Sequence, residues 1–528
     1  MRPTLPSKKS LQDLLRRTDW ALLLFLACAV NVKLYVKLAA IAGYALSLLL
    51  RKVRWERPPG PVWFYVLMPV LGVSAAALHG SFGEHGYLTG AALGATQWLA
   101  GGAILYLLFL SAKKNSPQAL AATIKTFFAL NALVTLGQFA GLIVESGHAM
   151  PYWFYDSGLK YGASTGDRLT GLCFNNSLNN AAISLMGLLY FIARARLGWA
   201  ALCALILMMC TSNVVTFGML LLLLLMLCVG GRKGLRSDAL KLLLLTVLFY
   251  PVLSPQNFTY IRGIVGRLAV KSEPFIAAEM PDADSLLSNT AAKRLHDPLH
   301  SMSLHVSKSM LRQMPENLAA LRHESDTMQK PAWSYLALEP AALRPAFEKW
   351  YGVPPEHTLL ANYGKPAKVF AVRQTISFLN TSPDLWIAGA GMGNFSSKLA
   401  VKMTGLRLQG SFPEDRIYIS RPFLEYHFYT LMYVLSRDVK EHSVINMPGS
   451  TYLQLAGEYG LIGLLLFALL YFGWFWMKAR DFKAGRWLLL ALLGLFWLDY
   501  WFEMMTLTVV MELLLLVGIF VRKSPDAD

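Results

Sequence analysis

The chain has 528 residues, of which 55% are hydrophobic and only 15% are charged, and its formal net charge is +17. Apolar runs about 20 residues long recur along it, which is typical of a polytopic membrane protein and argues against a soluble enzyme. In a soluble chain this charge would suggest a nucleic-acid partner. Here much of it lies in short loops between apolar runs, as in the cytoplasmic loops of membrane proteins. We therefore expect membrane lipids, and no nucleic acid, among its partners.

The predicted fold is all-α, with about 12 transmembrane helices and both termini in the cytoplasm. Residues 1–19 form a polar basic leader, which we expect to be cytoplasmic. Residues 20–50 are apolar but interrupted by Asn31, Lys33 and Lys37. Two short spans in this stretch place the basic residues before it and those after it on the cytoplasmic side. Further spans are predicted at about 61–79, 88–111, 118–144, 171–193, 198–212, 214–230, 238–254, 450–476, 486–502 and 504–521.

Residues 255–449 form a hydrophilic insert between spans nine and ten. This order gives spans 1–9 within 20–254, spans 10–12 within 450–521, and a cytoplasmic tail at 522–528. The apolar spacing in the insert favours short amphipathic helices, namely Leu304–Arg312, Pro366–Leu379 and Pro422–Leu435. The glycine-rich stretch Gly389–Gly393 predicts a tight loop in which backbone comes close to another segment.

The insert carries no recognised nucleotide motif, and we expect neither a metal nor another cofactor. Three of its histidines, His296, His300 and His305, are close in sequence, but Pro298 argues against a regular helix that would bring them together. All ten histidines fall on the non-cytoplasmic side of the predicted topology. Imidazole acid–base chemistry would therefore act outside the cytoplasm.

The most informative stretch is Pro448–Phe467, where the chain enters the membrane again. Thr451, Gln454 and Glu458 follow i, i+3, i+7 spacing and form one polar stripe on a helix. A carboxylate just inside an apolar span is a site hypothesis by default, so we expect this stripe, together with Tyr452, to line a cavity. The alternative is a structural Glu458, hydrogen-bonded between packed helices.

Two arginines are candidates for binding phosphate, because a guanidinium stays charged and offers a planar fork of donors. Arg168 lies where an outer loop enters a span, in GDRLTGLCFNNSLNNAA, and Arg373 lies on the predicted helix Pro366–Leu379. The alternatives are a salt bridge or an interfacial position for Arg168 and a solvated basic face for Arg373. If both point into one cavity, they could neutralise a diphosphate.

Three stretches in this order resemble the O-antigen ligase/polymerase superfamily of bacterial envelope glycosyltransferases: RLTGLCFNNSLNNAA (168–182), VRQTISFLNTSPDLWIAGAGMGNF (372–395) and PGSTYLQLAGEYGLIGLLLF (448–467). The resemblance implies a protein of the bacterial inner membrane with its large helical loop in the periplasm. It implies metal-independent, inverting transfer from a polyprenyl-diphosphate-linked glycan donor to a glycan, lipid or protein acceptor hydroxyl. Arg168 and Arg373 match the arginine positions that hold the diphosphate.

The base that would deprotonate the acceptor is the point at which the chain departs from this family. Members often have a histidine at the head of the re-entry motif, where this chain has Gly449. His442 and Glu458 are the leading candidates, with His427 and Glu425 behind them. A ligase and a polymerase, which differ in acceptor, both remain open. So do a transporter or flippase of a lipid-linked glycan, suggested by Asp499, Glu503 and Glu512, and a non-catalytic paralogue.

Overall fold

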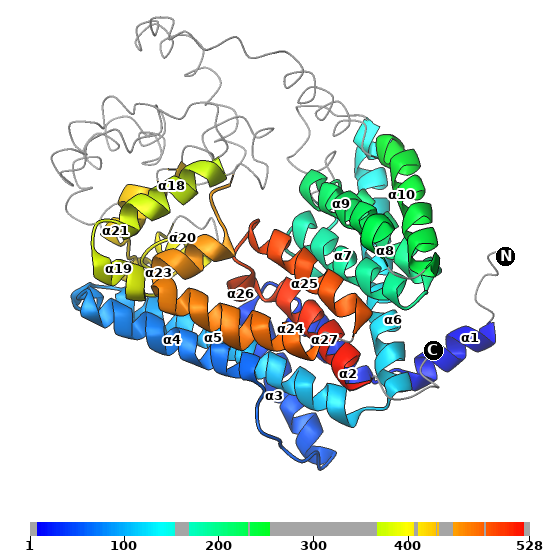
Figure 1. Cartoon of the computed structure of the whole chain (residues 1–528), viewed down its shortest axis with the longest axis horizontal. Coiled ribbons are helices and arrows are strands. Elements are labelled where there is room, and N and C mark those ends of the chain that lie inside the picture. Colours follow the sequence, from blue (N-terminus) through cyan, green and yellow to red (C-terminus); the bar gives the residue numbers. More distant parts are fainter. Residues whose placement is uncertain are drawn as a thin grey trace, which may run out of the picture.

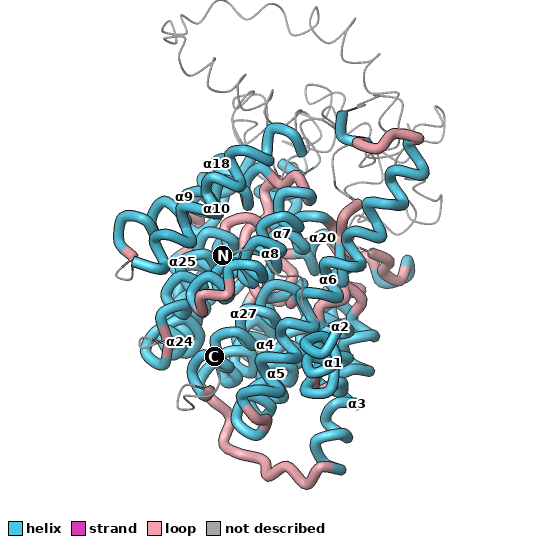
Figure 2. Tube along the Cα trace, turned by 90° about the vertical axis from the view of Figure 1, so that its right-hand side faces the viewer, coloured by secondary structure: helices cyan, strands magenta, loops and turns pink. Residues whose placement is uncertain are grey.

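The structure is a computed structural model that describes residues 8–153, 168–230, 233–253, 367–405, 410–428, 430–431, 447–479 and 482–521. Within these ranges the protein is all-helical, with 79% helix and no strand, as the sequence predicted (Figure 2). His442, the three histidines near residue 300 and the helix predicted at 304–312 lie outside the described residues.

The first half of the chain forms one short helix within the predicted leader and then helices that follow the predicted spans closely. They are α1 (Lys8–Arg17), α2 (Trp20–Ala29), α3 (Leu34–Leu50), α4 (Gly60–Leu78), α5 (Tyr87–Lys114), α6 (Pro117–Ser146), α7 (Ser177–Ala193), α8 (Leu197–Met209), α9 (Asn213–Val229) and α10 (Lys233–Leu253). Local signals set their ends. Ser116 caps α6 by accepting a hydrogen bond from the Ala119 amide, and Gly147 ends that helix in the left-handed conformation.

The second half begins with short helices and ends with long ones. They are α18 (Ala367–Leu379), α19 (Pro383–Ala388), α20 (Lys398–Met403), α21 (Arg421–Phe423), α23 (Thr451–Leu466), α24 (Trp474–Lys478), α25 (Lys483–Phe496), α26 (Trp501–Met504) and α27 (Thr506–Phe520). Two π-helical turns, Leu424–Phe428 and Phe467–Gly473, continue α21 and α23. The helix predicted at Pro366–Leu379 is confirmed as α18.

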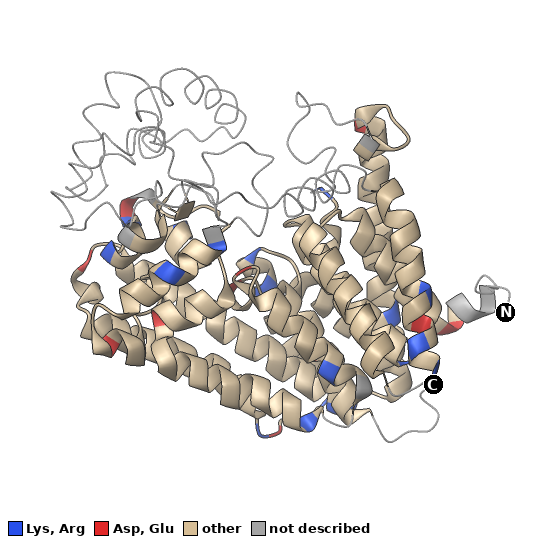
Figure 3. Ribbon diagram, turned by 45° about the horizontal axis from the view of Figure 1, so that its top comes forward, with Lys and Arg blue, Asp and Glu red and all other residues tan. Residues whose placement is uncertain are grey.

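The chain has the apolar helices of a membrane protein. Among the described residues, four are long and apolar enough to cross a bilayer: α4, α5, α6 and the stretch Thr451–Lys478. Seven more are apolar but shorter: α2, α3, α7, α8, α9, α25 without its first residue, and α27. Charged residues are sparse along the long helices (Figure 3). That twelve helices cross the membrane, and which side the termini face, stay predictions.

Helix α27 forms the centre of the bundle. Every residue from Thr506 to Gly518 is buried, and α27 packs against α5, α7, α25 and α2. Helices α7–α10 gather at one end of the molecule, and the short helices α18–α21 gather at the other, above α4 and α5 (Figure 1). The candidate site lies in this second group.

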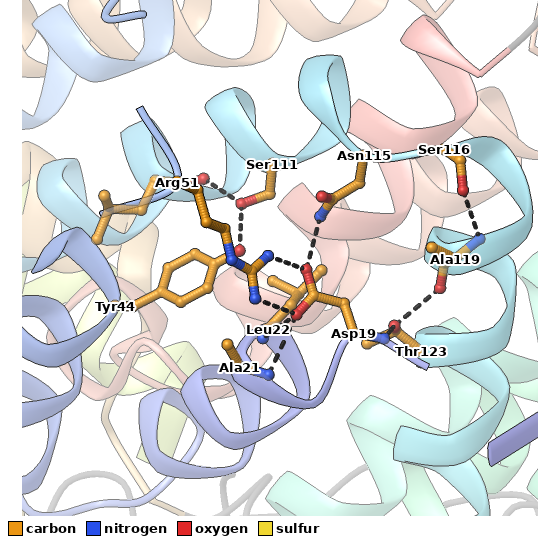
Figure 4. Close-up of polar contacts among 11 residues, drawn as sticks. Asp19, Ala21, Leu22, Tyr44, Arg51, Ser111, Asn115, Ser116, Ala119 and Thr123 are labelled. Carbon is orange, nitrogen blue, oxygen red and sulfur yellow. Dashed lines mark hydrogen bonds and ion pairs between the residues drawn. The ribbon is translucent and has the colours of Figure 1, made fainter. Parts of the chain in front are cut away.

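A polar network at the N-terminal end of α2 confirms that residues 20–50 form two helices that fold back on each other. Asp19 caps α2 through the Ala21 and Leu22 amides, at 3.1 and 3.2 Å, and Arg51 after α3 binds the same carboxylate at 2.8 Å (Figure 4). Asn115 after α5 also donates to Asp19, at 3.2 Å. The basic residues before α2 and after α3 therefore lie at the same end of the bundle.

We expect Asp19→Ala to destabilise the protein more than Asp19→Asn. Burial raises the pKa of Asp19, but the Arg51 guanidinium and the two amides outweigh it and hold the pKa below its ordinary value. The stabilisation from this charge is present at neutral pH and is lost as the pH falls through the lowered pKa. Asparagine keeps the helix cap and loses only the ion pair, whereas alanine loses both, at a cost of about 1–2 kcal/mol for the cap alone.

The measurement is thermal unfolding of the purified protein in detergent at pH 7. Lys241→Ala serves as the control, because the Lys241 side chain is 58% exposed and, among the described residues, forms its ion pair with Asp238 alone, at 3.4 Å. Equal melting temperatures for wild type and Asp19→Ala would contradict the proposed role of the network.

Candidate functional site

The glycine loop, Gly389–Phe395, is inserted between α4 and α23. Gly389, Gly391 and Gly393 all have positive φ, at 73°, 90° and 78°. The Ala390 and Gly391 amides donate to the Gly457 and Glu458 carbonyls of α23, at 2.9 and 3.0 Å. The loop therefore brings backbone close to another segment, as the sequence predicted.

Asn394 fixes the shape of this loop. Its side-chain amide donates to Ser81 Oγ and to the Ala390 carbonyl, both at 2.9 Å, and its oxygen accepts from the Tyr418 hydroxyl at 3.0 Å. Ser420 Oγ donates to the Asn394 carbonyl at 2.6 Å. All polar groups of this buried asparagine side chain are thus used inside the protein.

Glu458 lies directly under the end of the glycine loop. The side chain is fully buried, and Oε1 accepts a hydrogen bond from the Phe395 amide at 3.3 Å. Oε2 has no hydrogen-bond partner among the described residues. Gly460, two residues later, breaks the helical geometry of α23 with φ 61° and ψ −158°, and the α19–loop junction packs against it.

The predicted polar stripe on α23 is buried on one side of the helix, and its members have different environments. Thr451 Oγ1 donates to the Asp499 carbonyl at 2.7 Å, whereas neither polar atom of the fully buried Gln454 amide has a partner in the described structure. Tyr452 is half-buried and donates to the Leu493 carbonyl at 2.8 Å. That these residues line a cavity stays a prediction.

Helix α25 ends earlier than the sequence predicted, at a point where it contacts the N-terminal end of α23. The span predicted to reach residue 502 stops as a helix at Phe496. Carbonyls at and beyond this end accept hydrogen bonds from side chains of other elements: Phe496 from Ser450, Leu498 from Lys368 and Asp499 from Thr451. These side chains replace the helical partners that the carbonyls would otherwise need.

A buried group of hydroxyls and imidazole, formed by Ser396, His427 and Tyr500, lies beside the glycine loop. Tyr500 Oη is 3.0 Å from His427 Nε2 and 3.1 Å from Ser396 Oγ, and Ser396 Oγ is 3.4 Å from the same imidazole nitrogen. His427 is only 2% exposed. Burial, and to a lesser degree the charge of Lys368, lowers the pKa of His427 to about 3, so its imidazole is neutral at pH 7.

Gly449, where the family often has histidine, faces this group. A Cβ added to Gly449 would lie 2.9 Å from the Tyr500 ring, so the tyrosine occupies the space next to the glycine. Lys368 Nζ donates to the Gly449 carbonyl, and burial lowers the pKa of Lys368 to about 8. A histidine from a different element therefore reaches the neighbourhood of position 449.

The two predicted arginines do not meet in the structure. Arg168 forms an ion pair with Glu145 at the end of α6. This is the salt-bridge alternative, although the expected partner was the preceding residue, Asp167. Arg373 lies on the exposed face of α18, whereas Lys368 on the same helix points inward. Their roles in binding diphosphate stay predictions.

The three carboxylates that suggested transport have separate environments. Glu512 on α27 accepts hydrogen bonds from the Tyr65 and Tyr471 hydroxyls, both at 2.8 Å. Glu503 on α26 accepts a hydrogen bond from the Lys398 amide at 2.7 Å. The Asp499 side chain accepts one from the backbone amide of the next residue, Tyr500, at 2.8 Å. Among the described residues, no group of three or more His, Cys, Asp or Glu is placed to hold a metal ion.

Ser396, Tyr500 and Lys368 are site residues that the sequence analysis missed. Ser396 directly follows the glycine loop, in Asn394-Phe-Ser-Ser-Lys398, so its place in the motif was a usable signal. Tyr500 gave no signal, because it was expected inside a continuous span. Lys368 was visible only as one of several basic residues before Arg373.

We expect Gly391→Ala to destabilise the protein and displace the loop. At Gly391 a Cβ would lie 2.6 Å from the Ala76 amide nitrogen, and the positive φ adds a strain of about 1–3 kcal/mol for a residue with a side chain. Gly218→Ala is the matched control, because nothing lies within 4 Å of its added Cβ. Thermal unfolding measures the difference; an unchanged melting temperature for Gly391→Ala would contradict the observed loop geometry.

Comparison of the chain with protein-family models, with curated proteins and with solved structures gave no match in any of the three. The resemblance to O-antigen ligases and polymerases therefore rests on the three sequence stretches alone. The geometry of the site supplies the independent argument for function.

Proposed function

We propose that the protein is a glycosyltransferase that moves a glycan from a polyprenyl diphosphate to an acceptor hydroxyl on the periplasmic face of a bacterial inner membrane. One observation carries this proposal: a neutral buried imidazole, His427, lies beside Gly449 and within hydrogen-bond reach of two hydroxyls. A neutral imidazole is the commonest general base in proteins, and the family often has a histidine at position 449.

In the proposed reaction the acceptor hydroxyl oxygen attacks the anomeric carbon of the donor sugar. The bond from that carbon to the diphosphate oxygen breaks, and the electron pair leaves with the diphosphate. His427 Nε2 takes the acceptor proton, because the negatively charged diphosphate that enters the site raises the pKa of the imidazole from about 3 toward neutral pH. For this the acceptor hydroxyl replaces Ser396 or Tyr500 as hydrogen-bond partner of the imidazole, with the ring proton on Nδ1.

Buried polar groups that lack partners support a sugar-binding role for the surrounding surfaces. Gln454 Oε1 and Nε2, Glu458 Oε2 and Gln374 Nε2 have no hydrogen-bond partner among the described residues. Gln374 is on α18 and the others are on α23, and these two helices pack together. Amides and carboxylates are suitable partners for sugar hydroxyls, and a buried polar group without a partner costs about 1–3 kcal/mol.

We expect His427→Gln to lower glycan transfer by about 10²–10⁴-fold, because glutamine can keep a hydrogen bond to Tyr500 but cannot act as a base at neutral pH. The assay uses purified protein with a polyprenyl-diphosphate-linked glycan and measures transfer to the acceptor. His85→Gln is the control: His85 is exposed, and its Nε2 lies 2.8 Å from the Asp415 carbonyl oxygen, away from the His427 group.

Surface glycans of a deletion strain identify the acceptor class. Shortened chains would indicate a polymerase and unattached lipid-linked glycan a ligase, whereas donor retained inside the cell would point to transport and against the proposal. Full restoration of the surface glycans by His427→Gln would contradict the role of His427.

His427 also predicts how stability depends on pH. In the unfolded chain a histidine binds a proton below about pH 6.5, whereas the folded protein keeps His427 neutral to about pH 3. The unfolded state therefore gains protons first, and the stability contributed by this site is lost as the pH falls below about 6.5. We expect the melting temperature of wild type to fall more steeply between pH 7 and pH 4.5 than that of His427→Gln; parallel curves would show that His427 is not buried in a neutral form.

A further inference from the structure

Four lysines from distant parts of the sequence come together next to the Ser396–His427–Tyr500 group. Lys33 and Lys37 lie at the start of α3, and Lys398 and Lys402 are four residues apart on α20. Both segments meet at α26: Lys37 Nζ donates to the Met504 carbonyl at 3.0 Å, and the Lys398 amide donates to the carboxylate of the preceding residue, Glu503, at 2.7 Å. We call these four residues the lysine cluster.

No carboxylate among the described residues forms an ion pair with the lysine cluster. Glu503 is nearby, but its Oε2 accepts from the backbone amide of Lys398 at 2.7 Å, and no salt bridge joins it to an ammonium group. Lys37 is 1% exposed, and in the described part of the chain its ammonium donates to the Ala29 and Met504 carbonyls, at 2.6 and 3.0 Å. Burial lowers the pKa of both Lys398 and Lys402.

This arrangement is unfavourable for the protein alone. Bringing like charges together in a partly buried place costs free energy, because each charge loses solvation and repels the others. The carboxylates of Asp499 and Glu503 attract Lys398 and offset part of this cost, but they do not bond to the ammonium groups. An anion with several oxygens would satisfy the free donors and remove the repulsion.

Two uncharged groups without partners lie on the elements that adjoin the cluster. Asn179 and Thr506 stand in the first turns of α7 and α27, which pack against each other. Both Asn179 side-chain atoms and Thr506 Oγ1 are buried without a hydrogen-bond partner in the described structure. Thr506 follows Met505, next to the Met504 carbonyl that binds Lys37, so Thr506 is close to the lysines in the chain.

We propose that the lysine cluster binds a phosphate or diphosphate group. The proposal rests on the proposed function, since it places there the diphosphate of the glycan donor. Lys398 and Ser396 belong to one short segment after the glycine loop, so a diphosphate at the lysines lies next to the proposed base His427. The cluster thus supplies the converging positive charge that Arg168 and Arg373 do not supply in this structure.

The test measures binding to the purified full-length protein with two probes, inorganic pyrophosphate in solution and a polyprenyl diphosphate in lipid nanodiscs. We expect the double variant Lys398→Gln/Lys402→Gln to weaken binding by at least about tenfold. We also expect it to keep or raise the melting temperature, because it removes charge repulsion. Lys402→Arg keeps the charge and should bind within a few-fold of wild type.

Lys241→Gln is the control, because its side chain is exposed and lies outside the cluster. Weaker binding of both probes supports the phosphate site, and weaker binding of the nanodisc probe alone identifies the lipid as the source. Unchanged binding in the double variant, or no binding of either probe by wild type, would overturn the proposal. Retained diphosphate binding by a wild type that transfers no glycan would overturn the proposed function and leave the lysine site standing.

Discussion

The insertion of the glycine loop between α4 and α23 is the interaction on which the site depends. Its amides bond to carbonyls of α23 and to the Gly72 carbonyl of α4, so two segments far apart in the sequence are joined by backbone alone. Each such bond contributes about 0.5–1.5 kcal/mol, and losing a partner in the interior costs more. The end of the loop and the residues after it are positioned by these bonds: the Phe395 amide donates to Glu458, Ser396 lies within hydrogen-bond reach of His427, and the Lys398 amide donates to Glu503.

The fit leaves no room for side chains at the loop. Cβ atoms added at Gly389 and Gly391 would lie 2.4 and 2.6 Å from backbone atoms of α23 and α4, which cannot move as a flexible side chain can. Gly460 of α23 lies opposite Gly389, and a Cβ added to Gly460 would lie 2.5 Å from the Ile387 carbonyl oxygen. Glycines on both surfaces are therefore needed for one contact, which explains why a glycine-rich loop and a helix with a break occur together.

The helices were predictable from the sequence, whereas the composition of the site was only partly so. Apolar runs and caps are local signals, and most helix ends fall within a few residues of the predicted spans. The exceptions have a tertiary cause: α25 ends at Phe496 because side chains from α18 and the head of α23 take the carbonyls beyond it. Glu458 was found because a buried carboxylate stands out in an apolar run. His427 and Lys368 were less visible, because nothing local distinguishes an inward-facing basic residue from a solvated one.

The buried groups around the loop fall into two kinds, and the difference bears on function. Asn394 and Thr451 have their hydrogen bonds completed inside the protein, so they hold the architecture. Gln454, Glu458 Oε2 and Asn179 are equally buried but have no hydrogen-bond partner among the described residues. Burying polar groups without hydrogen bonds lowers the stability of the folded protein, so a function is expected to explain their presence. The proposed function gives Gln454 and Glu458 a use, because the hydroxyls of a bound sugar would complete the hydrogen bonds that the chain leaves open.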